Sequence, residues 1–117
     1  MSATWTPADI EPRLANLAAL RDGWEEGALA ISPESVATMR AVLAILSEAG
    51  MPRPHVYPTP KGGLQCEWRD VEGEIETDAT IVSWWFQSGD VGTANAAGSD
   101  VERITRAFVA LTKGATQ

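Results

Sequence analysis

The stretch "HVYPTPKGGLQCEWR", His55–Arg69, decides the fold class, because its apolar residues recur at every second position. A period of two is typical of a β-strand with one buried face. Between the two alternating runs, Thr59-Pro60-Lys61-Gly62 suits a type I turn, so the stretch predicts a β-hairpin. Pro58 cannot donate a backbone hydrogen bond, and this predicts that the first strand lies at an edge of its sheet.

Two more strands are expected after the hairpin, at "EIET" (Glu74–Thr77) and "TIVSWWFQ" (Thr80–Gln87). Side chains alternate between the two faces of a strand, so Trp84 and Trp85 are predicted to point in opposite directions. The face of Trp84 is the more apolar and is assigned to the core, whereas Trp85 is expected on a polar face with Ser83. The same polar face is expected to carry the outward side chains of the third strand, Glu74 and Glu76.

Helical periodicity precedes the strands. A first helix is predicted to begin between Thr6 and Pro12 and to end at Gly23, with a late start or a kink accommodating Pro12. A second helix is predicted from the Ser32 cap to Gly50, which is suited to a left-handed C-terminal cap. Its buried stripe is expected to be Val36, Met39, Leu43 and Leu46.

The segment "SGDVGTANAAGSD" (Ser88–Asp100) contains three glycines and no periodicity, and its first part, 88–98, is interpreted as a loop. Ser99 is predicted to cap a last helix, with Glu102 completing a capping box. The expected architecture is a single α+β domain over residues 1–117 with all helices on one face of an antiparallel sheet. Its parts are a helical hairpin (1–50), a four-stranded meander (54–87), the loop (88–98) and the C-terminal helix (99–114).

The charge balance restricts the choice of partners. The 117 residues carry a net charge of −7, with Lys at only two positions and no basic run. Phosphate backbones and anionic lipid surfaces repel such a chain, so we expect no direct binding of nucleic acid or membranes. A protein partner with a basic surface is favoured instead.

Other compositional features concern the compartment. No run of 18 apolar residues is present, so no membrane span is predicted. The start of the chain has neither a basic segment nor an apolar one, so it is not expected to act as a signal peptide. Cys66 is the only cysteine, which excludes an internal disulfide and suits a reducing cytoplasm.

Trp85 has two interpretations on a polar sheet face. Another element, such as the N-terminal segment with Trp5, covers it, or it anchors a protein interface. The uncharged strand Ile81–Gln87 is expected to be the last of the meander, so its free edge suggests a homodimer or an added partner strand. The predicted contact residues are Trp85, Glu74, Glu76, Ser83, Trp24 and Glu25.

The turn "GWEEGA", Gly23–Ala28, lies between the two predicted helices. The structural interpretation is that Trp24 closes the end of the helical layer while the glycines permit the turn. Glu25 is then solvated, or meets basic groups of a partner together with Trp24.

No complete catalytic, cofactor or metal motif is present, so no enzyme activity, cofactor or metal site is predicted. His55 and Cys66 suggest a base and a nucleophile, but Cys66 shares the inward parity of Leu64 and is expected to be a buried apolar residue. Alternating glutamates are typical of a solvated sheet face. The alternative function is a small-molecule or metal-binding protein, or a small enzyme, built on the 88–98 loop and His55.

The motifs "GWEEGA", "SPES" and "VYPTPKGGLQCEW" resemble those of a family of small, largely uncharacterised bacterial and phage proteins. That family has a Gly-Trp-acid turn ending in Gly-Ala, and a Pro-Thr-x-x-Gly-Gly hairpin leading into Glu-Trp. The resemblance spans residues 14–76 and departs at Glu26, where the family tends to have glycine. It implies the order of helices before strands and carries over no catalytic residues.

The resemblance also favours a mobile-element setting, in which small acidic proteins often block a larger host machine. The leading hypothesis is therefore a non-enzymatic protein-binding module that acts as an inhibitor. It includes immunity-type, antitoxin-like and anti-defence roles, with a phage origin as one source.

Overall fold

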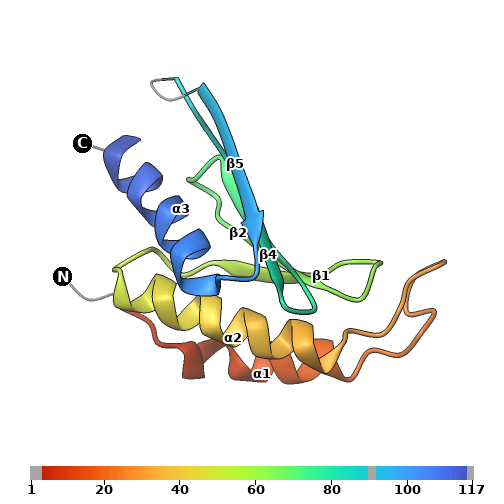
Figure 1. The fold of residues 1–117 in the computed structure, drawn as a ribbon. Coiled ribbons are helices and arrows are strands. Elements are labelled where there is room, and N and C mark those ends of the chain that lie inside the picture. Colours follow the sequence, from red (N-terminus) through yellow and green to blue (C-terminus); the bar gives the residue numbers. More distant parts are fainter. Residues whose placement is uncertain (1–3, 90–91, 116–117) are drawn as a thin grey trace.

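The computed structural model of the chain describes residues 4–89 and 92–115. Two helices precede a five-stranded sheet, and a third helix follows it (Figure 1). The elements are α1 (Pro7–Ala18), α2 (Pro33–Glu48), β1 (His55–Pro58), β2 (Leu64–Glu67), β3 (Gly73–Asp78), β4 (Ile81–Ser88), β5 (Gly92–Gly98) and α3 (Val101–Ala115). The predicted α+β class, with helices before a meander and one helix after it, is confirmed.

The sheet is an antiparallel meander in the order β1-β2-β3-β4-β5. Figure 1 shows the strands turning progressively from β1, which lies above α2, to β5, which lies beside α3. The helices contact one side of the sheet, α1 and α2 toward β1–β3 and α3 toward β4 and β5. We call this helix-covered side the inner face and the opposite side the outer face.

The prediction of a loop at 88–98 is wrong over its described part. Gly92–Gly98 forms β5, which pairs with β4 from Val82 opposite Gly98 to Ser88 opposite Gly92, while residues 90–91 lie outside the described chain. The inward positions of β5 hold alanine and glycine instead of large apolar residues, so the alternation is hard to recognise in the sequence. At the end of the strand, a Cβ on Gly98 would lie in ordinary van der Waals contact with Ile104 of α3, 3.4 Å from its Cδ1.

The fifth strand also changes the edges of the sheet. The prediction that Ile81–Gln87 has a free edge is wrong, because β4 is hydrogen-bonded between β3 and β5. The edge position predicted for the strand containing Pro58 is confirmed, since β1 pairs only with β2 in the described sheet. The second edge is β5.

The core is centred on Phe108 of α3, which is fully buried. Trp68 stacks on its ring with centroids 5.4 Å apart, and the rings of Trp84 and Phe86 meet it edge-on at 5.6 and 5.9 Å. Aromatic pairs in these arrangements add to the free energy gained from burying their area. The last helix therefore holds β4 and the residue that follows β2 together from the inner face.

Helix α2 fixes the turn between β3 and β4. Thr38 Oγ1 donates to the carbonyl of Ala79 at 2.6 Å, and the Ala79 amide donates to Ser35 Oγ at 2.8 Å. Ala79 has a φ of 52°, a left-handed conformation that is uncommon for a residue with a Cβ. These bonds hold the turn against the helix and so keep β3 and β4 in fixed positions.

The helix ends agree with the sequence in part. Ser32 caps α2 as predicted, accepting from the Ser35 amide at 3.1 Å, and α1 runs through Pro12. The predicted capping of α3 by Ser99 is wrong by one residue. Asp100 accepts from the Arg103 amide at 3.2 Å, because the helix begins at the next residue.

Two other helix ends differ from the prediction. Helix α1 ends at Ala18, well before Gly23, which instead adopts a φ of 82° in the following loop. Helix α3 continues through Gly114. Across residues 4–89 and 92–115, no helix has both the length and the apolar character that a membrane crossing requires.

Candidate functional site

The two adjacent tryptophans of β4 lie on opposite faces, as the parity of the strand predicts. Trp84 is 6% exposed on the inner face, and Trp85 is 39% exposed on the outer face. Val82 and Phe86 are buried with Trp84, whereas Ser83 lies on the side of Trp85. The assignment of faces made from the sequence is confirmed.

The strand register arranges the outer face into two rows that cross all five strands. One row runs from β1 to β5 through His55, Glu67, Glu74, Trp85 and Asn95. The second row runs in the same direction through Tyr57, Gln65, Glu76, Ser83 and Ala97. Four of the predicted contact residues, Glu74, Glu76, Ser83 and Trp85, are therefore neighbours.

These four residues line a hollow of about 320 Å³ over β3, β4 and β5. In the pairing of β3 with β4, Trp85 is opposite Glu74, and Ser83 is opposite Glu76. The β5 side of the hollow is formed by Asn95, Ala96 and Ala97. The sequence did not predict the β5 side of the hollow, because residues 88–98 were interpreted as a loop.

The carboxylates of the outer face differ in their partners. Glu67 and Glu74 are directly opposite each other, an arrangement that is unfavourable for like charges. The Gln65 amide reduces this cost because its Nε2 donates to both, at 3.1 Å to Glu67 and 2.6 Å to Glu74. Glu76 has no hydrogen bond or ion pair with any described residue, so its carboxylate is available to a partner.

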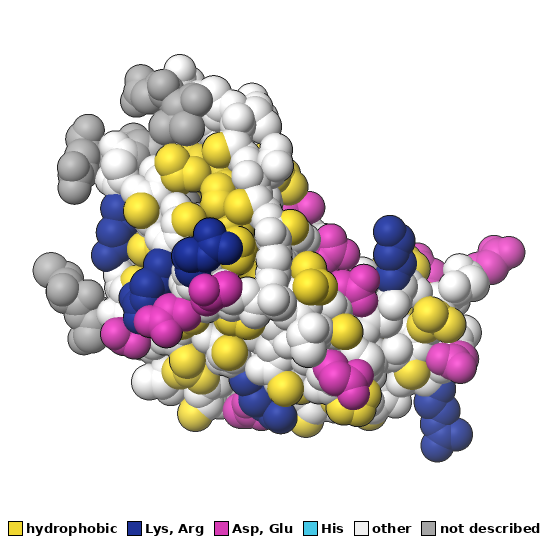
Figure 2. All heavy atoms as spheres, viewed as in Figure 1, with side chains coloured by type: hydrophobic (Ala, Val, Ile, Leu, Met, Phe, Trp, Pro, Cys, Tyr) yellow, Lys and Arg dark blue, Asp and Glu magenta, His cyan; other side chains and the backbone are white. Residues whose placement is uncertain are grey.

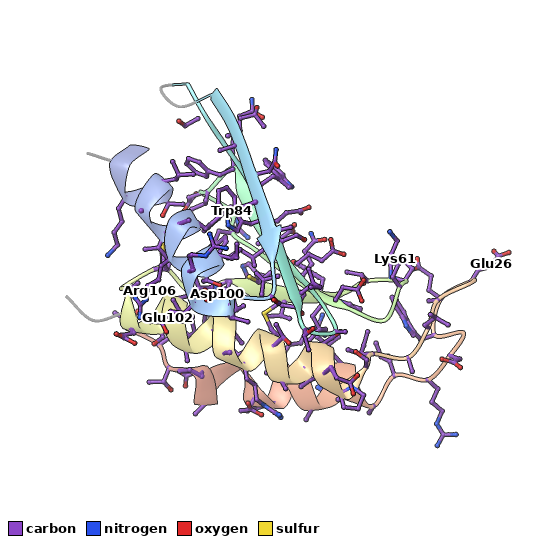
Figure 3. All side chains as sticks on the ribbon, viewed as in Figure 1. Glu26, Lys61, Trp84, Asp100, Glu102 and Arg106 are labelled. Atoms are coloured by element: carbon purple, nitrogen blue, oxygen red, sulfur yellow. The ribbon has the colours of Figure 1, made fainter. Side chains whose placement is uncertain are left out.

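The strands carry a single sign of charge on the outer face, while Arg69, just after β2, borders its β1 end beside Tyr57 and Glu67. Among the described strand residues, no lysine or arginine lies on it, while Glu67, Glu74, Glu76 and Asp78 do. Figure 2 shows acidic side chains gathered beyond β5, on the side turned away from α3. Figure 3 places Lys61 farther out, at the turn between β1 and β2. The face is therefore electrostatically suited to a basic surface.

The five tryptophans differ in how their indole N–H groups are satisfied. Four of them donate to backbone carbonyls at 2.7–2.8 Å: Trp5 to Met51, Trp24 to Leu29, Trp68 to Pro52 and Trp84 to Ile104. Trp85 has no hydrogen-bond acceptor and no aromatic contact within the described part of the chain. It is thus the one tryptophan that the described fold leaves partly exposed and without a polar partner.

The N-terminal segment does not provide the predicted alternative cover. Trp5 is buried in the core, and its backbone carbonyl accepts from Ser47 Oγ of α2 at 2.9 Å. It therefore lies against the helices, and no described element covers Trp85. Met1–Ala3 lie outside the described residues.

Trp24 and Glu25 are not part of this hollow. They lie in the loop between α1 and α2, which is hydrogen-bonded to the β1–β2 turn through the Leu29 amide and the Pro60 carbonyl at 2.9 Å. Trp24 is half-buried and braces its own loop instead of closing the helical layer. Figure 3 shows Glu26 at the far tip of this loop.

The residues of the alternative function do not come together. His55 lies on β1 and residues 92–98 form β5, at opposite edges of the sheet. Cys66 is fully buried on the inner face, whereas His55 is exposed on the outer face. Burial raises the pKa of the Cys66 thiol to about 12, so the thiolate needed for nucleophilic attack is disfavoured. No group of three metal-ligating side chains occurs among the described residues.

Comparison of the chain with protein-family models, with curated proteins and with solved structures gave no match. The family resemblance drawn from the motifs therefore stays a prediction.

Sequence reasoning left several outer-face residues out of the contact set. Tyr57 is 41% exposed at the β1 end of the second row, and Asn95 and Ala97 complete the rows at β5. The parity of the hairpin was sufficient to place Tyr57 on this face. Asn95 and Ala97 could not be placed on this face, because the strand that carries them was not predicted.

Proposed function

We propose that the protein is a non-enzymatic binding module that uses the outer face of its sheet to hold a basic surface of a larger protein. The observation that supports this best is Trp85. Its indole is the only one of five without a polar partner among the described residues, and Trp85 lines the same hollow as Glu74 and Glu76.

The chemistry of the hollow favours an arginine or lysine side chain from the partner. An aromatic face attracts a cation through its quadrupole, and a carboxylate accepts charge-assisted hydrogen bonds from the same group. Trp85 supplies the aromatic face, while Glu76 supplies a carboxylate without a described partner. An arginine guanidinium can stack on the Trp85 indole and donate hydrogen bonds to the Glu76 carboxylate at the same time.

The charge of the whole chain supports the same proposal. With a net charge of −7, the protein attracts basic partners and repels acidic ones. Electrostatic complementarity mainly accelerates association and sets specificity. Tryptophan at the centre of an interface commonly carries a large share of the binding free energy. The acidic residues then guide the partner, and Trp85 anchors it.

A module of this kind acts by occupying a surface of its partner. The proposal therefore includes inhibition of a larger protein, as in immunity-type, antitoxin-like or anti-defence factors of phages and other mobile elements. The basic regions of proteins that handle nucleic acids are surfaces on which an acidic protein competes directly with the substrate.

Affinity capture with matched variants tests the proposal. The immobilised wild type is incubated with a bacterial lysate in parallel with Trp85→Ala, Glu76→Lys and Leu29→Ala, and captured proteins are quantified by mass spectrometry. Leu29 is the control because it is 53% exposed and lies in the distant α1–α2 loop.

We expect basic proteins that are retained by wild type and Leu29→Ala and lost with Trp85→Ala and Glu76→Lys. Their retention should also weaken as salt screens the charges. Equal capture by the wild type and Trp85→Ala contradicts the proposal, as does a retained set dominated by acidic proteins.

A further inference from the structure

The two edge strands of the sheet differ in how their backbone groups are protected. On β1, Pro58 has no N–H to offer, and Arg13 Nε donates to the Val56 carbonyl at 3.0 Å. This edge is also only four residues long. Short edges, proline and covering side chains are the usual means of preventing edge-to-edge pairing.

The β5 edge has none of these protections. Gly92–Gly98 contains no proline and no charged residue. No described residue hydrogen-bonds to the backbone groups on the edge of β5 that points away from β4. Figure 1 shows no helix in front of β5, and in Figure 2 its backbone is an uncovered run of white spheres. A strand of this length and composition is a template for pairing.

The ladder determines which backbone groups of β5 are free. The Gln87 amide donates to the Glu72 carbonyl at 2.9 Å, so the backbone groups of Gln87 point toward β3. Directions alternate along an antiparallel strand, so those of Phe86 point toward β5, where its partner is Ala94. The groups that point away from β4 therefore belong to Thr93, Asn95 and Ala97.

These three residues are symmetric about Asn95. If a second β5 pairs in antiparallel orientation, Asn95 faces Asn95 of the other copy, and Thr93 faces Ala97. Each facing pair exchanges two backbone hydrogen bonds. We propose that β5 pairs with β5 of a second copy of this chain, which joins the two sheets into one ten-stranded sheet with a two-fold axis at Asn95.

The charge distribution permits a second copy at this edge although each chain is acidic. Neither Ile81–Ser88 nor Gly92–Gly98 contains a charged residue, so the four strands around the axis are uncharged. Asp100, two residues beyond β5, is ion-paired with Arg103 at 3.5 Å. On the described strands, the nearest outer-face carboxylates are on β3 of each copy. They are about five strand spacings apart, roughly 24 Å, and at that distance physiological salt screens their repulsion.

Apolar side chains next to the edge support the same pairing. Ala94 and Ala96 point to the inner face and pack against the core, yet both stay half-buried because no strand follows β5 in the described sheet. Figure 2 shows hydrophobic side chains between β5 and α3. A second copy covers these apolar side chains, while Trp85 stays free on the outer face. The inference is thus independent of the proposed binding function.

Light scattering on the purified full chain measures the assembly. We expect the wild type to have twice the 12.5 kDa mass of the chain at high concentration. Asn95→Pro removes an edge donor and leaves the β4 ladder intact, so it should give a folded monomer. Ala96→Pro is the matched control, because it removes a donor from the β4 ladder and should lower the melting temperature instead.

A cross-linking pair tests the register and does not depend on the folding of a proline variant. In the Asn95→Cys variant the two introduced thiols face each other across the axis, within disulfide range. In Thr93→Cys they are displaced by four residues, roughly 13 Å, and cannot be bridged. We expect mild oxidation to link the first variant and not the second, since Cys66 is buried.

A wild type that stays monomeric at high concentration overturns the proposal, and a partner protein's strand then becomes the occupant to consider. A dimer that survives in folded Asn95→Pro, or equal cross-linking of both cysteine variants, also overturns it, because the contact then lies elsewhere.

Discussion

Trp84 and Trp85 are adjacent in the sequence and have opposite roles in the structure. Trp84 donates its indole N–H to the Ile104 carbonyl at 2.8 Å and packs edge-on against Phe108. Trp85 has neither kind of contact among the described residues and is 39% exposed. The same residue type therefore serves the core on one face, and is available for binding on the other.

The two faces of the sheet differ in the same way. On the inner face the Trp84 and Trp68 indoles donate to backbone carbonyls and their rings pack against Phe108 of α3, so substitutions there are expected to change stability. The outer face carries carboxylates and one exposed indole with no described element above them, so substitutions there are expected to change binding.

The largest effect is expected from Trp84→Ala. It removes the ring contact with Phe108 and leaves the Ile104 carbonyl without its donor. Large-to-small changes of a buried aromatic residue typically cost about 3–5 kcal/mol, and we expect a loss of that size in the free energy of unfolding. Urea unfolding followed by circular dichroism measures it. A loss below about 1 kcal/mol contradicts the role of Trp84 in the core.

Alkaline pH is expected to destabilise the inner face through Cys66. Burial raises the pKa of this thiol from its usual 9.0 to about 12, so between these values the folded chain retains a proton that the unfolded chain releases. The free energy of unfolding should therefore fall as pH rises above 9, by roughly 1.4 kcal/mol per pH unit at most.

Urea unfolding at a series of pH values measures this dependence for the wild type and Cys66→Ala. The variant has no thiol and should have a shallower slope. Parallel slopes for the two proteins would show that Cys66 is not the titrating group.

Thr105→Val is expected to raise the free energy of unfolding, by less than Trp84→Ala lowers it. Thr105 Oγ1 is buried in α3 and has no hydrogen-bond partner among the described residues. Replacing such a hydroxyl with a methyl group removes a desolvation cost, so we expect a gain of about 1 kcal/mol. Thr112→Val is the matched control, because its hydroxyl donates to the Val109 carbonyl at 2.8 Å and the change should destabilise the protein. Thermal unfolding distinguishes the two variants. A loss of stability in both contradicts the prediction.

The smallest effect on stability is expected from Trp85→Ala. The indole is exposed on a polar face and has no described polar partner, so the loss should be less than about 1 kcal/mol. The measurement is urea unfolding under the conditions used for Trp84→Ala. A loss comparable to that of Trp84→Ala would remove the distinction between the two faces.

The sequence predicted the parts of this fold that have strong local signals. The period of two identified the hairpin and β4, and parity separated Trp84 from Trp85. Proline indicated that β1 is an edge strand, and Ser32 was correctly identified as the cap of α2. These features depend on a few neighbouring residues, and such residues are visible in one sequence.

β5 was missed because its signal is not local. "GTANAAG" (Gly92–Gly98) has neither large apolar residues nor branched ones in alternation. It forms a strand because β4 offers it an edge with which to pair. The same error assigned a free edge to β4 and left Asn95 and Ala97 out of the candidate site.

The central claim is that Trp85 serves binding and not folding. The most direct test is the Kd of a captured basic partner for the wild type and Trp85→Ala, with the free energy of unfolding measured on the same preparations. We predict a loss of binding free energy of at least about 2 kcal/mol, roughly 30-fold in Kd, with stability nearly unchanged. An unchanged Kd, or a loss of binding that only accompanies unfolding, would contradict the account.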